Sequence, residues 1–400
     1  MKHTLHPSGT LKIVADENIV AVEDLYRQHG ELLLLPGRQI RAADVRDADV
    51  LLVRSITRVD RALLEGSRVQ FVATATSGTD HLDLKYLSAA GIGVAEAAGS
   101  NANAVVEYCL SGIAELICRG MFSLRGQRAA IIGFGHVGRG LYRRLRELGV
   151  DCVVCDPFVE SSAPEDIQFC SLETALSASL ISLHTPLSRI GEHPTWHLLN
   201  QERLDRLAPG TLLINAARGE VVDNAALLKR LARSNDLLTL WDVWENEPEI
   251  SRDLLGLVSL GTPHIAGYSV EAKRSASQRN YEAFLQHFNL PAHSTSDAMA
   301  ERRTMLKVNL AEIHNRGGRD LDEVILAECL RAAFSVSAVD QRLRSADADN
   351  GAAVFDGIRK TLGARREFSH YMLEQSLLDG GLISPTIATR LSSLGFSFSC

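Results

Sequence analysis

The sequence lacks the features that would place it in a membrane or nucleic-acid-binding class. It contains no uninterrupted apolar stretch long enough to span a bilayer, and residues 1–10 have no apolar segment typical of a secretory signal. It also lacks a basic excess, because 42 Lys and Arg residues face 49 Asp and Glu residues, which gives a formal net charge of −7. We therefore expect a cytoplasmic protein that binds neither a membrane nor a nucleic acid.

Cysteines are few and irregularly spaced. The seven cysteines are an odd number with no framework spacing, which is typical of reduced thiols. Cys152 and Cys155 form a C-x-x-C pair, but they lie in a predicted strand, where residues three apart point to opposite faces. We expect no metal site there or elsewhere.

The sequence does have a regular alternation of short apolar runs and helical patterns. Its 400 residues, 46% of them hydrophobic, suffice for two or three domains with separate cores. The alternation predicts parallel sheets covered by helices in two successive units. Long helices are predicted over residues 101–119, which lead into the second unit, and over 269–288, which return to the first. Residues 299–400 carry charge-rich segments, and we expect an oligomerisation or accessory domain there rather than a second active site.

A glycine-rich turn marks the second unit. The apolar strand end I-I at 131–132 leads into G-F-G-H-V-G at 133–138 and then into a helical pattern. Such glycines permit a tight turn, approach to a pyrophosphate and close helix packing, although the pattern alone fits a plain strand–turn–helix equally well. Asp156 ends the next strand about 20 residues later, where a carboxylate binds ribose hydroxyls. Because this charge repels a 2′-phosphate, we expect NAD rather than NADP.

Three charged groups follow later strands of the same predicted sheet: Arg218, Glu247 and His264. Taken singly, each has an ordinary structural reading as a loop charge, a turn or a satisfied histidine. Together, at consecutive strand ends, they favour one cleft. Oxidation of a 2-hydroxy acid needs a base for the hydroxyl proton, a hydride acceptor and a cation for the carboxylate. His264, NAD and Arg218 fit these roles, and Glu247 is the candidate carboxylate that orients His264.

Several stretches carry a resemblance to a known family in their order and spacing. They are G-F-G-H-V-G at 133–138, H-T-P-L at 184–187, I-N-A-A-R-G at 214–219, D-V-W-E-N-E-P at 242–248 and T-P-H-I-A-G at 262–267. These resemble the signatures of the NAD-dependent D-2-hydroxyacid dehydrogenase superfamily. Additional matches are similar to its branch that acts on 4-phospho-D-erythronate: D-E-N at 16–18, V-R-S at 53–55, A-T-A-T-S-G-T-D-H at 73–81, A-V-V-E-Y at 104–108, H-I-A-G-Y at 264–268, F-D-G-I-R-K at 355–360, R-R-E-F-S at 365–369 and L-G-F at 394–396. Residues 1–10 and about 299–350 depart from that pattern.

The resemblance implies an α/β fold with two doubly wound, Rossmann-like parallel-sheet domains and a smaller C-terminal α+β dimerisation domain. Residues 11–108 and 269–298 would form the substrate-binding domain, 109–268 the NAD-binding domain and 299–400 the dimerisation domain of a homodimer.

It also implies roles for individual residues. Arg218, Glu247 and His264 would be catalytic, with His264 transferring the proton. Contacts with NAD are expected from Gly133, Gly135, His136, Val137, Gly138, Asp156, Thr185, Ala216, Arg218, Asp242 and Gly267. Contacts with substrate are expected from Ser55, Thr76 and Tyr268. We add Arg54 for the substrate phosphate, although a surface charge is an equal alternative, and Lys273 and Arg274 fit a charged helix face better.

The expected reaction is the NAD-dependent oxidation of 4-phospho-D-erythronate to (R)-3-hydroxy-2-oxo-4-phosphooxybutanoate in vitamin B6 synthesis. One alternative is another dehydrogenase of phosphorylated 2-hydroxy acids, such as one acting on 3-phosphoglycerate. A more distant alternative is a nucleotide-sensing corepressor, a role that the same fold also serves.

Overall fold

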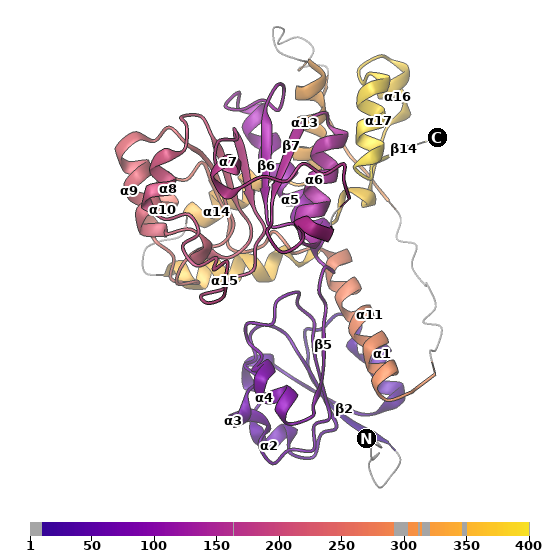
Figure 1. Cartoon of the computed structure of the whole chain (residues 1–400). Helices are drawn as coiled ribbons and strands as arrows, with labels where there is room; N and C mark the ends of the chain where they lie inside the picture. The colour runs from indigo at the N-terminus through magenta and orange to yellow at the C-terminus, as the bar shows by residue number, and fades with distance from the viewer. Residues whose placement is uncertain are drawn as a thin grey trace. The chain divides into compact units, whose positions relative to one another are not determined.

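The computed structural model describes residues 10–162, 164–291, 303–310, 313, 321–345 and 350–399. The chain divides into two units, which we describe separately (Figure 1). Unit 1 comprises Met1–Asn101 and Val270–Ala300, and unit 2 comprises Ala102–Ser269 and Glu301–Cys400. The predicted long helices are confirmed as α5 (Ala102–Cys118) and α11 (Val270–His287), and each begins at a boundary between the units. The proposed boundaries of three functional domains stay a prediction.

Unit 1 contains a five-stranded parallel sheet in the order β2-β1-β3-β4-β5. Its strands are β1 (Leu11–Asp16), β2 (Gly30–Leu35), β3 (Val50–Val53), β4 (Phe71–Thr74) and β5 (Gly93–Glu96). Its helices are α1 (Val22–Tyr26), α2 (Ala42–Val45), α3 (Arg61–Leu64), α4 (Leu84–Ala89) and α11. Two apolar clusters fill the two faces of the sheet, as expected for strands covered by helices on both sides.

Unit 2 contains a six-stranded parallel sheet in the order β11-β10-β9-β8-β6-β7. Its strands are β6 (Arg128–Ile132), β7 (Asp151–Cys155), β8 (Leu180–Leu183), β9 (Leu212–Asn215), β10 (Leu238–Trp241) and β11 (Leu260–Gly261). Its helices before the C-terminal part are α5, α6 (His136–Glu147), α7 (Leu172–Ala175), α8 (Gln201–Arg206), α9 (Asn224–Ser234) and α10 (Arg252–Leu257). The strand order reverses between β6 and β8, and ligands of such sheets bind outside the carboxyl ends of the strands at this switch point.

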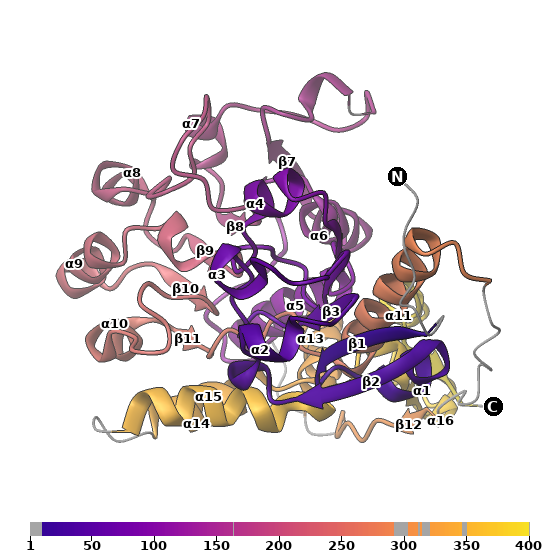
Figure 2. The same cartoon turned by 90° about the horizontal axis from the view of Figure 1, so that it is seen from below.

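The C-terminal part of unit 2 has α+β composition, as predicted. It contains a small parallel sheet of β12 (Thr304–Met305), β13 (Tyr371–Leu373) and β14 (Ser397–Phe398). Its helices are α13 (Leu321–Ala333), α14 (Val336–Arg344), α15 (Gly351–Thr361), α16 (Gln375–Asp379) and α17 (Pro385–Ser393). Helix α13 packs on α5, and α14 lies beside α15 and against β11 (Figure 2). One apolar core therefore includes both the large sheet and the C-terminal helices.

Two further expectations concern cysteines and membranes. The six cysteines in the described part of the chain are unpaired, as predicted. Burial raises the pKa of the Cys152 thiol to about 12 and that of Cys155 to about 11. Among the described residues, no helix combines the length and the apolar character needed to cross a bilayer.

Candidate active site

The glycine turn joins β6 to α6 at the switch point of the unit 2 sheet. Gly133 has φ +92°, and a Cβ there would lie 2.6 Å from the carbonyl carbon of His184, so this turn needs glycine. A Cβ at Gly138 would lie 2.0 Å from the Gly133 oxygen, whereas one at Gly135 would meet only open space. Gly135 and His136 are exposed and Val137 is half-buried at the start of α6. The first backbone N–H groups of this helix can therefore receive an anion.

Asp156 lies beside the glycine turn, as the sequence predicts. Its Oδ2 accepts a hydrogen bond from the Phe134 N–H at 2.7 Å, and its Oδ1 accepts one from the Phe158 N–H at 3.1 Å. This carboxylate is half-buried, so one side of it remains open to solvent. It is placed where a ribose of a dinucleotide would follow the pyrophosphate.

The residues after β8 close the other side of the turn. His184 Nε2 is 2.8 Å from Ser182 Oγ, and burial lowers the pKa of His184 to about 3. The Thr185 hydroxyl is buried and has no hydrogen-bond partner among the described residues. A buried polar group without a partner is costly, so this hydroxyl fits a ligand that would bind to it.

Arg218 follows β9 in a turn that the Asn215 side chain stabilises. The Asn215 amide donates to the Arg218 carbonyl at 3.1 Å and accepts from the Ala217 N–H at 3.2 Å. A Cβ at Gly219 would lie 2.0 Å from the Trp244 oxygen, so glycine here lets the loop of Arg218 lie against the loop after β10. Ala216, another expected NAD contact, is half-buried in the same turn.

Glu247 and His264 form a directly bonded pair. His264 Nδ1 is 2.7 Å from Glu247 Oε2, while Glu247 Oε1 accepts the Trp244 N–H at 2.8 Å. The His264 side chain is 36% exposed and the Glu247 side chain is 21% exposed, so solvent reaches the pair without fully hydrating it. With Nδ1 occupied by the carboxylate, the opposite nitrogen, Nε2, is the one available for a substrate proton.

Asp242 holds the loop that carries His264. Its carbonyl accepts the His264 N–H at 2.7 Å, and its Oδ1 accepts the Ile265 N–H at 2.8 Å and the Thr262 hydroxyl at 2.6 Å. Its Oδ2 accepts the Ala266 N–H at 2.9 Å. Burial raises the pKa of the Asp242 carboxyl despite these bonds. The structure therefore shows that Asp242 holds the loop 262–266 in place. Its contact with NAD stays a prediction.

Gly267 and Tyr268 continue the same loop. Both are half-buried, and the Tyr268 hydroxyl accepts a hydrogen bond from Arg359 Nη2 at 2.8 Å. Arg359 belongs to α15, so a C-terminal helix contacts a residue expected to bind substrate. Their predicted contacts with NAD and with substrate stay predictions.

The remaining predicted substrate residues lie in unit 1. Arg54 Nε donates to Asp16 Oδ2 at 2.9 Å, and Asp16 is fully buried, so Arg54 is held in place after β3 rather than being a loose surface charge. Ser55 is exposed, and Thr76 Oγ1 is 2.8 Å from Thr74 Oγ1. Burial and the charge of Arg54 lower the pKa of Lys273, a residue of α11.

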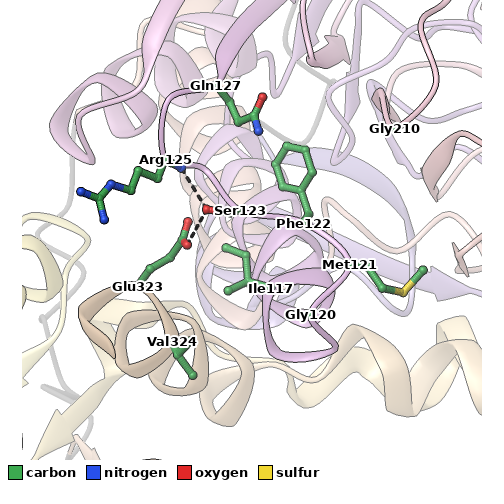
Figure 3. A pocket seen from close by; sticks show the side chains of 10 residues that line it. All are labelled: Ile117, Gly120, Met121, Phe122, Ser123, Arg125, Gln127, Gly210, Glu323 and Val324. Atoms are coloured by element: carbon green, nitrogen blue, oxygen red, sulfur yellow. Dashed lines mark hydrogen bonds between the residues drawn. The ribbon is translucent and has the colours of Figure 1, made fainter. Parts of the chain in front are cut away.

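A separate pocket of about 480 Å³ lies at the amino ends of β6 and β9 (Figure 3). Glu323 of α13 lines this pocket and accepts hydrogen bonds from the Ser123 hydroxyl at 2.7 Å and from the Leu124 N–H at 2.5 Å. Gln127 and Gly210, which precede the two strands, also line it. Because the candidate active site lies at the carboxyl ends of these strands, the pocket is not part of it.

Comparison with known proteins identifies the family. Residues 116–266 match the family model described as the D-isomer specific 2-hydroxyacid dehydrogenase, NAD binding domain. The erythronate-4-phosphate dehydrogenase of Chromohalobacter salexigens is 45% identical over 378 residues, which are 93% of this chain and 96% of that protein. That of Saccharophagus degradans is 42% identical over 386 residues, which are 96% of this chain and 99% of that protein. The chain belongs to the erythronate-4-phosphate dehydrogenase family. The predicted superfamily and branch are confirmed.

The fold of the protein is similar to that of several solved structures. The NAD-dependent formate dehydrogenase of Staphylococcus aureus in complex with NAD has a TM-score of 0.58 at 23% identity, covering 71% of this chain and 98% of its own. The D-lactate dehydrogenase of Aquifex aeolicus, complexed with NAD and lactic acid, has a TM-score of 0.59 at 22% identity, covering 70% and 96%. At these identities the likeness concerns the fold alone.

The candidate active site of this dehydrogenase fits NAD. Open space at Gly135, the exposed start of α6, the half-buried Asp156 carboxylate and the unpartnered Thr185 hydroxyl are all present at the switch point. The protein is thus an NAD-dependent D-2-hydroxyacid dehydrogenase, as predicted.

Sequence patterns do not single out two groups of residues that contact the site. Asn215 and Gly219 shape the turn of Arg218, and their only signal was their place inside a recognised motif. Arg365 and Glu367 contact the loop 262–269 from the C-terminal part. The sequence predicts only a dimerisation role for them, because no periodicity links them to a loop about 100 residues earlier.

Proposed function

We propose that this protein oxidises 4-phospho-D-erythronate at C2 with NAD⁺, and produces (R)-3-hydroxy-2-oxo-4-phosphooxybutanoate, NADH and a proton. The observation that carries the proposal is the bonded pair of His264 and Glu247 at the carboxyl edge of a dinucleotide-type sheet. The names of the relatives supply the substrate, since proteins aligned over nearly the whole chain are erythronate-4-phosphate dehydrogenases.

In this proposal His264 is the general base. Its Nε2 accepts the proton of the C2 hydroxyl, while Nδ1 donates to the Glu247 carboxylate, which stabilises the imidazolium that forms. Bound NAD⁺ supplies the acceptor for the hydride that leaves C2. In the reverse direction the same imidazolium returns its proton to the carbonyl oxygen.

Arg218 would bind the substrate carboxylate and the oxygen that becomes the carbonyl. A guanidinium forms paired, charge-assisted hydrogen bonds with planar oxyanions, and its fixed charge stabilises negative charge that develops on oxygen. The close contact of its loop with the Trp244 backbone supports its placement near Glu247.

Ser55, Thr76, Arg54 and Tyr268 are the residues proposed to contact the substrate. The ion pair with Asp16 uses Arg54 Nε, so the terminal nitrogens of Arg54 would bind the phosphate. A phosphate dianion suits such a group of donors.

The protein is further proposed to act as a homodimer through its C-terminal part, in the cytoplasm, as one step of vitamin B6 synthesis. The dimer rests on the resemblance of residues 355–360, 365–369 and 394–396 to the C-terminal domain of the family, and the pathway rests on the names of the relatives. The alternatives are another phosphorylated 2-hydroxy acid as substrate, or NAD sensing without turnover.

A substrate panel tests the proposal. Purified protein is mixed with NAD⁺ and either 4-phospho-D-erythronate, 3-phosphoglycerate or unphosphorylated D-erythronate, and NADH absorbance is recorded. We expect kcat/KM for 4-phospho-D-erythronate to exceed both other values, and to exceed that for unphosphorylated D-erythronate by at least about 100-fold, because unmatched phosphate contacts are costly. A preference for 3-phosphoglycerate would establish the sibling activity, and NADH binding without turnover of any compound would favour the sensor.

A further inference from the structure

The segment 365–368 of the C-terminal part reaches the loop 262–269 within unit 2. The Arg365 side chain is buried, and its Nη1 donates to the Ala266 carbonyl at 2.9 Å. Its Nη2 donates to the Ala104 carbonyl at 2.7 Å, near the start of α5. One guanidinium therefore ties the loop that carries His264 to the first long helix of the unit.

Both backbone polar groups of Ala266 bind buried ionisable side chains. Its N–H donates to Asp242 Oδ2 at 2.9 Å, and its carbonyl accepts from Arg365. Hydrogen bonds to ionised groups are about twice as strong as neutral ones, so the backbone is held on both the N-terminal and the C-terminal side of the Ala266 Cα. Ala266 lies two residues after His264, which means that its orientation determines the direction of the chain leaving the histidine.

Two more contacts from the C-terminal part hold the far end of the loop. Glu367 Oε1 accepts the Ser269 hydroxyl at 2.7 Å, and Glu367 Oε2 accepts the Asn103 amide at 2.6 Å. Arg359 of α15 donates to the Tyr268 hydroxyl at 2.8 Å. The C-terminal part thus contacts the loop at Ala266, Tyr268 and Ser269.

The backbone at His264 requires such support. Its φ is +54°, in the left-handed region that residues other than glycine rarely adopt. A conformation of this kind persists only where surrounding contacts over-determine it. Asp242 supplies contacts on one side of the loop and the segment 365–368 supplies them on the other.

We infer that Arg365 and Glu367 are positioning residues for His264, so that the C-terminal part completes the active site in addition to any role in dimerisation. This inference rests on the proposed function for the identity of the base. Burial of an arginine is costly unless its charge is compensated. Burial lowers the pKa of Arg365, and the charges of Glu107, Glu367 and Asp242 oppose that shift. Glu107 Oε2 also accepts the Phe368 N–H at 2.8 Å, so the segment 365–368 is bound to α5 as well as to the loop that carries His264.

The test compares Arg365→Lys with a matched control, Arg230→Lys. A lysine cannot bind the carbonyls of Ala266 and Ala104 together with the geometry of a guanidinium fork. Arg230 is equally buried, but it pairs with Asp236 at the end of α9, and no contact of its side chain involves the loop 262–269 among the described residues. Both variants remove one buried guanidinium, so a general loss of stability affects them alike.

For Arg365→Lys we expect kcat to fall by about tenfold or more and NADH affinity to fall by a smaller factor, because misplacement of a base affects the chemical step more than cofactor binding. We also expect backbone amides in the loop 262–269 to exchange with deuterium at least about tenfold faster, as the loop loses a fixed contact. Arg230→Lys should show neither change. A folded Arg365→Lys protein with wild-type kcat and wild-type exchange overturns the inference.

Hydrogen exchange needs no substrate, so it separates the two proposals. If wild-type protein fails to oxidise 4-phospho-D-erythronate, the proposed function fails, while the exchange comparison still tests the loop contact. If Arg365→Lys does not fold, Ser269→Ala replaces it, because this change removes only the hydroxyl that binds Glu367. We then expect a decrease in kcat of about threefold with faster loop exchange. Unchanged kcat and exchange in Ser269→Ala would equally overturn the inference.

Discussion

At the scale of single residues, Glu247 has two acceptor oxygens and both are in use. One accepts the Trp244 N–H and the other bonds His264 Nδ1. A carboxylate satisfies two donors at once, whereas an amide offers only one acceptor oxygen. The charge and the shape of Glu247 therefore both contribute to holding the imidazole in one tautomer.

Glu247→Gln should lower kcat by about 100-fold or more, because it removes the charge that stabilises the imidazolium and leaves one donor unsatisfied. The measurement is steady-state NADH formation, with thermal unfolding followed in parallel. Glu249→Gln is the control, since Glu249 is exposed on the same loop. A Glu247→Gln enzyme with near-normal kcat would remove Glu247 from the mechanism.

His184 by itself should make the stability of the folded protein depend on pH. Burial lowers its folded-state pKa to about 3, against the 6.5 of an unperturbed histidine, so between these values the unfolded chain binds the extra proton. Stability is thus present above pH 6.5 and is lost as the pH falls toward 3. Linkage gives a loss of about 2 kcal/mol between pH 7 and pH 5 from this residue.

His184→Gln should unfold with a smaller difference between pH 7 and pH 5 than wild type. All three tryptophans, Trp196, Trp241 and Trp244, lie in unit 2, so urea titration followed by tryptophan fluorescence reports on the unit that contains His184. Equal pH-dependence in the two proteins would show that His184 titrates normally in the folded state.

At the scale of elements, the β6–turn–α6 unit separates two roles of glycine. Gly133 and Gly138 are required by close backbone contacts, but Gly135 faces open space and has an extended backbone that alanine also adopts. A methyl group at Gly135 therefore has no protein atom to displace. It would instead occupy the space where a pyrophosphate approaches the helix.

Gly135→Ala should retain the wild-type unfolding temperature and weaken NADH binding by about tenfold or more, because the methyl group blocks close approach of the phosphates. Fluorescence titration with NADH measures the affinity. Gly256→Ala is the control, since Gly256 also faces open space but lies in α10. If Gly135→Ala binds NADH as wild type does, the cofactor does not approach the turn as we propose.

Local sequence patterns predicted the elements well where one rule dominates. Continuous apolar runs predicted the strands of the two large sheets except the two-residue β11, and apolar positions at helical spacing predicted α5 to within one residue at each end. The sequence also predicts one helix over residues 20–29, but these residues form the short helix α1 followed by a 3-10 turn over Arg27–His29, because Gly30 already begins β2 beside Leu11. Tertiary pairing thus shortened a helix that the sequence pattern favoured.

At the scale of the whole molecule, some residues of the site could be predicted from the sequence and others could not. The glycine turn and Asp156 were predictable because a motif and its partner are about 20 residues apart. Glu247 and His264 were predictable because strand ends of one sheet converge. The contact of Arg365 with Ala266 was not, since it depends on how helices α13 to α15 pack around the sheet. That packing makes the C-terminal part continuous with the core of unit 2.

The central claim is that hydride leaves C2 of 4-phospho-D-erythronate for NAD⁺, and an isotope measurement tests it most directly. Purified protein is incubated with NAD⁺ and 4-phospho-D-erythronate that carries deuterium at C2, and the NADH formed is analysed by mass spectrometry. Our account predicts NADH that carries the deuterium, and no such product from a His264→Gln variant. Unlabelled NADH, or labelled NADH formed equally well by the variant, would contradict it.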